Sequence, residues 1–314
     1  MIRNFDELRD AVDTPSDQTL AVAAATDPKT LAAVEAAKDR GIAEAILFGD
    51  VDEMKQGAEK EGVELSKFET RSVQGGPPEA ALAAVEAVSQ GPADIYMKGY
   101  IHTSAFLRAA LDKEVGLRSG HLLSHVFVLD ATHRGRLLFV TDGALNIDPE
   151  LADMAQIISN AVSLCHHFDN PEPKVGILSA VAAVKPSIPS SVDAASLAKM
   201  ADRDQIADCK IDGPFALDNA INPRAAEYKK IGGEVAGDSD IVVVPDVVTG
   251  NILAKSFPHI AGGQLAGLVV GGTAPIVLPS RADTLQSKLM GIVSAVIQTQ
   301  RMEGDELDVQ TVHF

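Results

Sequence analysis

The stretch Pro275-Ile276-Val277-Leu278-Pro279-Ser280-Arg281-Ala282-Asp283-Thr284 predicts a short buried strand that ends at Pro279 and a helix that begins near Asp283. Ser280 and Arg281 then lie in the turn between them. Open α/β sheets bind ligands where the carboxyl end of a strand meets the amino end of a helix. The unpaired N–H groups at a helix start suit an anion, and Arg281 adds a cation with a planar set of donors. The alternative is that residues 280–283 only cap the helix.

Strand and helix patterns alternate along the rest of the chain. Short apolar runs predict strands over residues 20–25, 44–48, 63–70, 94–97, 126–129, 137–140, 174–179, 206–211, 240–244, 265–270 and 276–278. Helix starts, marked by capping residues and prolines such as Thr26-Asp27-Pro28, predict helices over 28–40, 51–60, 77–89, 103–113, 150–167, 190–200, 249–260 and 283–301. Residues 302–314 are expected to form a loose or packing tail. Continuous apolar strands between helices indicate an α/β fold with mainly parallel sheets flanked by helices.

The chain length favours two domains, because 314 residues exceed one typical core. We expect a first α/β domain of residues 1–142 plus 273–314 and a second of residues 143–272. The return of the last strand and helix to the first domain would place Ser280 beside the cleft between the domains.

Composition excludes several classes of partner. The net charge of -17 argues against nucleic acid and anionic membranes. No stretch is apolar enough to span a membrane, and the first residues lack the apolar core of a secretory signal. The two cysteines, Cys165 and Cys209, form neither a CxxC pair nor a disulfide framework, which fits a reducing cytoplasm. Cys165-His166-His167 has no matching ligand set elsewhere, so no metal site is predicted.

The segment from Lys98 to Arg136 is locally basic on this acidic chain. It holds six Lys and Arg residues against three Asp and Glu residues. A small anionic substrate would need such a patch. A solvated face or one half of a subunit contact would explain it equally well.

Common cofactor and hydrolase motifs are missing: there is no GxGxxG after the first strand, no Walker A loop, no GxSxG and no HExxH. Instead, polar residues recur between an apolar strand and a helix. Five such sets are present: Lys98-Gly99 with His102-Thr103; Thr141-Asp142-Gly143 with Asn146; Asp212-Gly213-Pro214 with Asp218-Asn219; Pro245-Asp246 with Thr249-Gly250-Asn251; and Ser280-Arg281. Each set alone is a cap or a tight turn, but five together favour a cleft built for an anion.

In their order and spacing, these five sets resemble the phosphate acetyl/butyryl transferases over residues 20–301. The resemblance implies two domains of the isocitrate/isopropylmalate-dehydrogenase-like type with the active site in the cleft between them. It also implies an enzyme that catalyses acyl-CoA + phosphate = acyl phosphate + CoA, with CoA as a substrate and no metal or other cofactor. The run Ser-Arg-Ala-Asp-Thr followed by Lys288 is more similar to the butyryl branch. A homodimer or higher homo-oligomer is expected.

The family's catalytic Ser-Arg pair corresponds to Ser280 and Arg281. The acetyl branch has a downstream aspartate near the position of Ser287, where this chain has no carboxylate, so Asp283 is the candidate base. Lys98, Thr103 and Arg108 are the other expected phosphate donors. Further substrate-binding candidates are Asp142, Asn146, Asp212, Asp218, Asn219, Asp246, Thr249 and Asn251.

For the reaction itself we expect direct transfer in a ternary complex, because no histidine stands in a sequence context that would activate Ser280 as a nucleophile. Two other functions are open at this point. One is a metal- and NAD(P)-dependent decarboxylating dehydrogenase, in which Asp212, Asp218 and Asp246 would bind the metal. The other is a non-catalytic protein that binds CoA or acyl phosphate.

Overall fold

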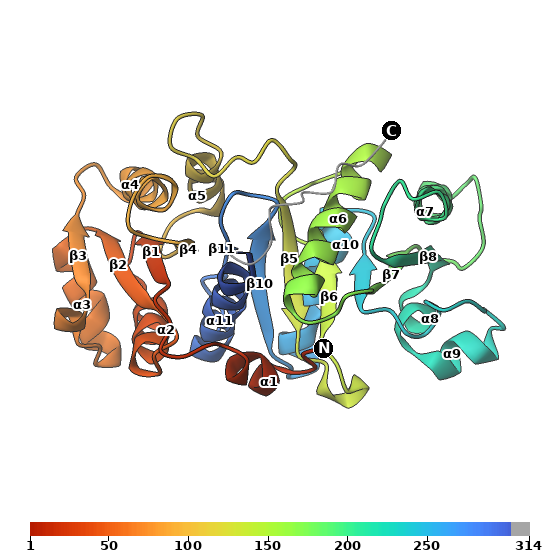
Figure 1. Cartoon of the computed structure of the whole chain (residues 1–314), viewed down its shortest axis with the longest axis horizontal. Coiled ribbons are helices and arrows are strands. Elements are labelled where there is room, and N and C mark those ends of the chain that lie inside the picture. Colours follow the sequence, from red (N-terminus) through yellow and green to blue (C-terminus); the bar gives the residue numbers. More distant parts are fainter. Residues whose placement is uncertain (303–314) are drawn as a thin grey trace. The chain divides into compact units, whose positions relative to one another are not determined.

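The computed structural model describes residues 1–302, which divide into two compact units (Figure 1). We call Phe5–His121 with residues 266–302 the terminal unit, and Met1–Asn4 with Leu122–Leu265 the central unit. These units differ from the predicted domains at residues 1–4, 122–142 and 266–272, and the division into domains stays a prediction. All but the first residue of the predicted tail lies outside the described part of the chain.

The terminal unit is a sheet with helices on both faces. Its strand order is β3-β2-β1-β4-β11-β10, with bounds Glu69–Ser72, Glu44–Gly49, Thr19–Ala23, Ile95–Lys98, Ile276–Val277 and Leu265–Val270. The first five strands run parallel, and β10 is antiparallel to β11. Figure 1 shows α4 and α5 above this sheet and α2, α3 and α11 below it. The helices are α1 (Phe5–Asp10), α2 (Pro28–Asp39), α3 (Val51–Glu61), α4 (Pro77–Ser89), α5 (Thr103–Ala110) and α11 (Leu285–Met302), with a 3-10 turn at Leu65–Lys67.

The centre of this sheet is apolar on both faces, as a strand covered by two helix layers requires. Leu20 to Ala23 of β1 are all buried, and so is every residue of β4. After β1 the chain turns into α2, where the Asp27 side chain caps the helix and Pro28 occupies its first turn.

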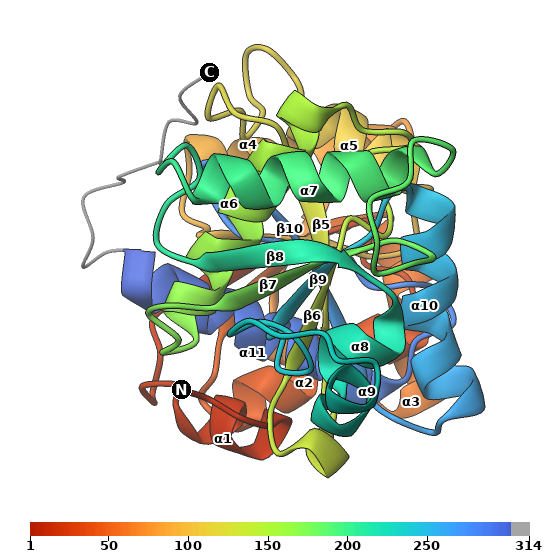
Figure 2. The same cartoon turned by 90° about the vertical axis from the view of Figure 1, so that its right-hand side faces the viewer.

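The central unit has the strand order β5-β6-β9-β7-β8. The strands are Ser124–Leu129, Leu138–Thr141, Ile241–Val243, Lys174–Leu178 and Lys210–Phe215. β5 and β6 form an antiparallel hairpin, and the remaining pairs are parallel. Figure 2 shows α6 and α7 above β7–β9, with α8 and α9 below and α10 at the right. These helices are Leu151–His167, Pro189–Ala201, Leu217–Ile221, Pro223–Tyr228 and Val247–Ile260, with a 3-10 turn at Thr132–Arg134.

The predicted α/β fold with helix-covered sheets is confirmed. The strand pairs are mainly parallel, with antiparallel pairs at β10–β11 and β5–β6. Several local predictions were wrong. The predicted strand at 63–70 is a 3-10 turn followed by the short β3, and α1, α8 and α9 were not predicted. The predicted strand at 206–211 is shifted to Lys210–Phe215. Pro214 lies within that strand because β8 is the last strand in the order, where the missing N–H of proline is tolerated.

Candidate functional site

The carboxyl ends of three neighbouring parallel strands of the terminal unit meet at one side of its sheet. β4 lies between β1 and β11, with Lys98 paired to Ala23 and Met97 paired to Val277. The chain leaves β1 for α2 on one face, whereas α4 leads into β4 from the other face. The point between β1 and β4 is therefore a topological switch point, where open α/β sheets bind ligands.

Close backbone packing brings β4 and β1 together at this point. A Cβ added at Gly99 would lie 2.3 Å from the carbonyl oxygen of Ala24 and 2.5 Å from that of Ala23. Glycine therefore lets the chain after Lys98 cross directly over the end of β1.

Lys98, the last residue of β4, is a buried cation with 3% of its surface exposed. Its Nζ donates one long hydrogen bond, of 3.4 Å, to the Gly99 carbonyl oxygen. Burial lowers the pKa of the Lys98 ammonium to about 8, and the charges of Lys288 and Arg281 add to this effect, while Asp27 and Asp283 oppose it. A buried cation with neighbouring cations would gain a partner if an anion bound.

Ser280 and Arg281 lie in the predicted turn after β11. The Asp283 carboxylate accepts the Ser280 backbone N–H at 2.7 Å, and the Ser280 hydroxyl oxygen accepts the Ala282 N–H at 3.4 Å. The Arg281 guanidinium is exposed and lies 4.7 Å from the centre of the Tyr100 ring, in a cation–π contact. The turn thus presents the Ser280 hydroxyl and the Arg281 fork to solvent.

Two charged residues at this point were not predicted as site residues. Lys288 on α11 is 2% exposed, donates to the Ser280 carbonyl oxygen at 3.0 Å and lies 3.4 Å from Asp27 Oδ2. Burial raises the pKa of Asp27, but hydrogen bonds from Thr30 and the charge of Lys288 outweigh burial, so that the pKa is below its usual range. The sequence contained a signal that could have identified Lys288 as a site residue, because it is a charged residue in the first turns of an otherwise apolar stretch of α11.

Thr103 and Arg108, the remaining predicted phosphate donors, are exposed residues of α5. Thr103 is the first residue of the helix that follows Lys98, and Arg108 is in its last turn. The structure therefore brings Lys98, Ser280, Arg281 and Asp283 together, with Thr103 one loop away.

These residues form a charged group that we call the switch-point cluster: Lys98, Arg281 and Lys288, with the carboxylates of Asp27 and Asp283. Three cations against two carboxylates leave one positive charge in excess. The arrangement suits a small anion such as phosphate.

In the central unit, Asp142 holds its own loop together. Its carboxylate accepts the backbone N–H groups of His125, Ala144, Leu145 and Asn146 and the Asn146 side-chain amide, at 2.7–3.3 Å. Asn146 also donates to the Leu123 carbonyl oxygen. Both predicted residues fix the shape of the segment after β6.

The predicted residues at the start of α10 likewise form local contacts. The Asp246 carboxylate caps the helix by accepting the Thr249 N–H at 2.8 Å and its hydroxyl at 3.1 Å. Asn251 donates to the Gly143 carbonyl oxygen, which joins this helix to the Asp142 loop.

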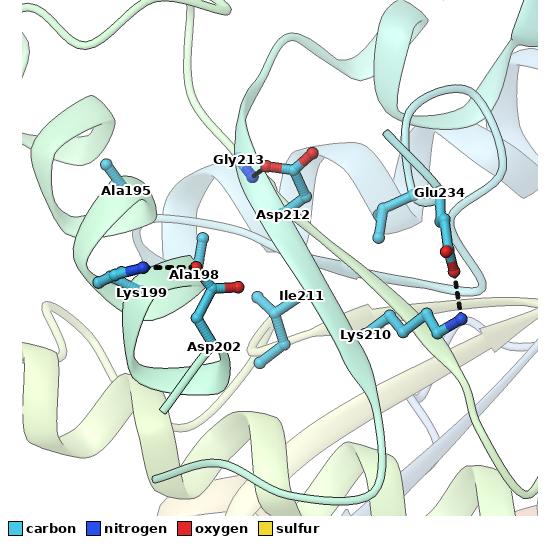
Figure 3. Close-up of a pocket in the computed structure, with 10 residues that line it drawn as sticks. Ala195, Ala198, Lys199, Asp202, Lys210, Ile211, Asp212, Gly213 and Glu234 are labelled. Carbon is cyan, nitrogen blue, oxygen red and sulfur yellow. Dashed lines mark hydrogen bonds and ion pairs between the residues drawn. The ribbon is translucent and has the colours of Figure 1, made fainter. Parts of the chain in front are cut away.

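Contrary to the sequence pattern, Asp212, Gly213 and Pro214 lie within a strand and not after it. Asp212 lies within β8 and lines a pocket of about 410 Å³ between β8 and α7 (Figure 3). Burial raises the pKa of its carboxyl group. In that pocket Lys199 pairs with Asp202, and Lys210 pairs with Glu234. Asp218 and Asn219 lie in α8, where Asp218 pairs with Lys229 and Asn219 is buried.

Within residues 1–302, no group of three or more His, Cys, Asp or Glu side chains is arranged to hold a metal ion. Among the helices of the same residues, none is long and apolar enough to cross a membrane.

Comparison with known proteins gives a consistent set of relatives. Residues 77–296 match the family model described as "Phosphate acetyl/butaryl transferase". The chain is 44% identical to a phosphate butyryltransferase of Clostridium acetobutylicum over 297 residues, which cover 95% of this chain and 98% of the relative. It is 36% identical to a phosphate acetyltransferase of Rhizobium meliloti over 297 residues, covering 95% and 94%. A solved branched-chain phosphotransacylase from Enterococcus faecalis V583 superposes with a TM-score of 0.79 at 30% identity, covering 90% of this chain and 99% of that chain.

Proposed function

The chain belongs to the phosphate acetyl/butaryl transferase family, and from this premise we propose that it prefers butyryl to acetyl as the acyl group. The protein is a phosphate acyltransferase that catalyses acyl-CoA + phosphate = acyl phosphate + CoA. The preference for butyryl is supported by the higher identity to the butyryltransferase, 44% against 36%. The run Ser-Arg-Ala-Asp-Thr followed by Lys288, which is more similar to the butyryl branch, supports the same preference.

The switch-point cluster is the observation that carries the proposed site of chemistry. Arg281 and Lys98 hold the phosphate there, since both are cations and the Nζ of the buried Lys98 donates one long hydrogen bond, to the Gly99 carbonyl oxygen. Thr103 and Arg108 are secondary phosphate donors at the start and end of α5.

The proposed reaction is direct transfer in a ternary complex. A phosphate oxygen attacks the thioester carbonyl carbon, the carbonyl oxygen takes up negative charge, and the C–S bond then breaks to release the CoA thiolate. The Ser280 hydroxyl donates to that carbonyl oxygen, while Arg281 offsets the charge of the phosphate. Holding two anionic substrates in one orientation supplies much of the remaining acceleration.

In the reverse direction, the CoA thiol must lose its proton before it attacks the acyl phosphate, because the thiolate is the nucleophile. Asp283 is the proposed acceptor of that proton. Asp283→Asn tests this role, because an amide oxygen can still accept the Ser280 N–H and keep the turn. The variant should lose rate in the CoA-consuming direction, and an unchanged rate would remove Asp283 from the mechanism.

For the central unit we propose a supporting role, in which polar side chains keep the segments after β6 and β9 in shape. We infer this because their hydrogen bonds lie within the central unit and join residues of these two segments. The residues concerned are Asp142, Asn146, Asp246, Thr249 and Asn251. Direct contact of these residues with CoA remains a prediction, as does that of Asp212, Asp218 and Asn219. A cytoplasmic location also remains a prediction.

A homo-oligomer is proposed on a separate observation. Ile147, Val248 and Ile252 are 75%, 62% and 65% exposed. Val248 and Ile252 share one face of α10, and the Val247 N–H donates to the Ile147 carbonyl oxygen. Exposed apolar side chains that gather in this way mark contact surfaces. Ile252→Glu should lower the sedimentation coefficient towards the value of a monomer. An unchanged sedimentation coefficient would rule out this face as the contact surface between subunits.

The experiment that tests the function is release of free thiol from butyryl-CoA and acetyl-CoA, with and without phosphate, in the presence of a chelator. Phosphate-dependent release that is faster with butyryl-CoA is expected. Faster release with acetyl-CoA would assign the acetyl branch. Release from neither thioester would contradict the function, and binding without turnover or metal-dependent NAD(P) reduction would then identify one of the two other functions.

A further inference from the structure

Lys288 occupies a position that is unfavourable for a cation. It lies in the first turns of α11, near the positive end of the helix dipole, and is 2% exposed. Removing an ammonium group from water costs several kcal/mol unless partners replace the solvent. An apolar residue would fit the surrounding helix face, so the burial of Lys288 calls for an explanation beyond helix packing.

The partners of Lys288 connect the reacting turn to a fixed point of the fold. Its Nζ donates to the Ser280 carbonyl oxygen at 3.0 Å and lies 3.4 Å from Asp27 Oδ2. That same Asp27 oxygen accepts the Thr30 N–H at 2.9 Å and the Thr30 hydroxyl at 2.6 Å, so it is held at the start of α2.

Both backbone polar groups of Ser280 are therefore held by side chains. The Asp283 carboxylate accepts its N–H at 2.7 Å, and Lys288 donates to its carbonyl oxygen at 3.0 Å, which also accepts the longer Asp283 backbone N–H bond of 3.2 Å. The peptide planes on either side of Ser280 set the directions of the Ser280 hydroxyl and of the Arg281 side chain. An error of about 1 Å in such a placement can cost about 10²-fold in rate.

We infer that Lys288 is a positioning residue for the transfer reaction: its ammonium group ties the Ser280 carbonyl oxygen to Asp27 and thereby sets the orientation of Ser280 and Arg281. This inference rests on the proposed site of chemistry at Ser280 and Arg281. The competing explanation is that Lys288 only joins α2 to α11, which pack against each other along the terminal unit.

Lys288→Met tests the inference, because methionine keeps an unbranched apolar chain of similar volume. We expect kcat to fall by about 10²-fold while KM for acyl-CoA changes by less than about threefold, since the lost orientation acts in the transition state. The matched control is Lys67→Met, which removes ion pairs of 3.1 and 3.0 Å to Glu35 and Asp39 of α2, away from the turn. The control should keep kcat within about twofold of the wild type.

A double-mutant cycle separates positioning from simple joining of the two helices. In a Ser280→Ala/Arg281→Ala background, Lys288→Met should lower kcat by less than about threefold, because both side chains that it positions are already gone. If Lys288 only joins α2 to α11, its effect on kcat will be the same in both backgrounds. Equal effects, or a Lys288→Met enzyme with wild-type kcat, would overturn the inference.

Two further measurements cover failure of folding and failure of the proposed function. If Lys288→Met does not fold, Asp27→Asn replaces it, because asparagine still caps α2 but lacks the charge. Asp27→Asn should show the same loss of kcat, and a wild-type kcat would overturn the inference.

If the wild-type protein shows no phosphate-dependent turnover, the proposed function fails. Amide hydrogen exchange at Ser280 and Asp283 then decides the matter: faster exchange in Lys288→Met but not in Lys67→Met supports positioning, and equal exchange contradicts it.

Discussion

Charged residues follow strand ends both in the switch-point cluster of the terminal unit and in the segments after β6 and β9 of the central unit. The two regions differ in how many hydrogen bonds the charged side chains make within the protein. Asp142 accepts five hydrogen bonds from its own neighbourhood, and Asp246 accepts two from Thr249. Lys98, by contrast, is buried with one long hydrogen bond to a neighbouring carbonyl oxygen, beside two other cations.

This difference separates residues that shape a loop from residues that can bind a ligand. A carboxylate that is saturated by backbone N–H groups stabilises the fold and has little left to offer a substrate. A buried cation among cations is costly until an anion arrives. The switch-point cluster is therefore the place where phosphate should bind, and substitutions in the two regions should affect different quantities.

The largest expected effect is on turnover. Arg281→Ala should lower kcat/KM for phosphate-dependent thiol release by about 10²–10³-fold, because a preorganised charged donor is lost. Arg71→Ala is the matched control, since Arg71 is a half-buried arginine that also lies on an aromatic ring, 5.4 Å from the centre of Phe48. A similar loss in both variants would mean that the cation–π contact, and not the position of Arg281, is responsible.

In the central unit the large effect should be on stability. Asp142→Ala removes a 3% exposed carboxylate and leaves several N–H groups without their acceptor, which should cost about 2–4 kcal/mol of unfolding free energy. Urea denaturation followed by circular dichroism measures it. A drop in kcat/KM without a drop in the unfolding free energy would instead assign Asp142 a direct role in the reaction.

An intermediate effect should appear in the pH dependence of phosphate use. The pKa of Lys98 is lowered to about 8, so its positive charge is present below that pH and is lost as the pH rises through 8. The KM for phosphate should accordingly rise above pH 8, by up to about tenfold per pH unit. Lys98→Arg, which keeps its charge, should move this rise to higher pH. The acyl-CoA-consuming direction is the one to measure, because it contains no free thiol substrate, and a phosphate KM that stays flat to pH 10 would contradict the role of Lys98.

The smallest effect should come from Asp246→Ala. Loss of the α10 cap should cost about 1 kcal/mol of stability. Its kcat/KM for phosphate should stay within about threefold of the wild type. A loss as large as that of Arg281→Ala would remove the distinction between the two regions.

Much of the fold could be predicted from the sequence because strands buried on both faces leave continuous apolar runs, and because caps such as Asp27-Pro28 mark helix starts. The short helix α8 has no such cap, and α9 begins with the cap Asn222-Pro223 but is only 6 residues long, too short to show a helical period. Pro214 was expected to end a strand, and it does not because β8 is at the end of the strand order.

For the site, the sequence led to Ser280, Arg281 and Lys98 through their position at strand ends. It could not separate them from Asp142 or Asp246, because the number of hydrogen bonds that a carboxylate accepts depends on the folded loop around it. Lys288 and Asp27 are far apart in the sequence, and their pairing across α2 and α11 follows only from the packing of the two helices.

The most direct test of the phosphate site is a crystal structure with tungstate, a phosphate analogue whose anomalous scattering locates it without ambiguity. We predict an anomalous peak within hydrogen-bonding distance of Lys98 and Arg281, which disappears in crystals of Arg281→Ala and remains in those of Asp246→Ala. A peak at the central unit's Asp246 and Thr249, with none at the switch-point cluster, would contradict the assignment of that cluster as the phosphate site.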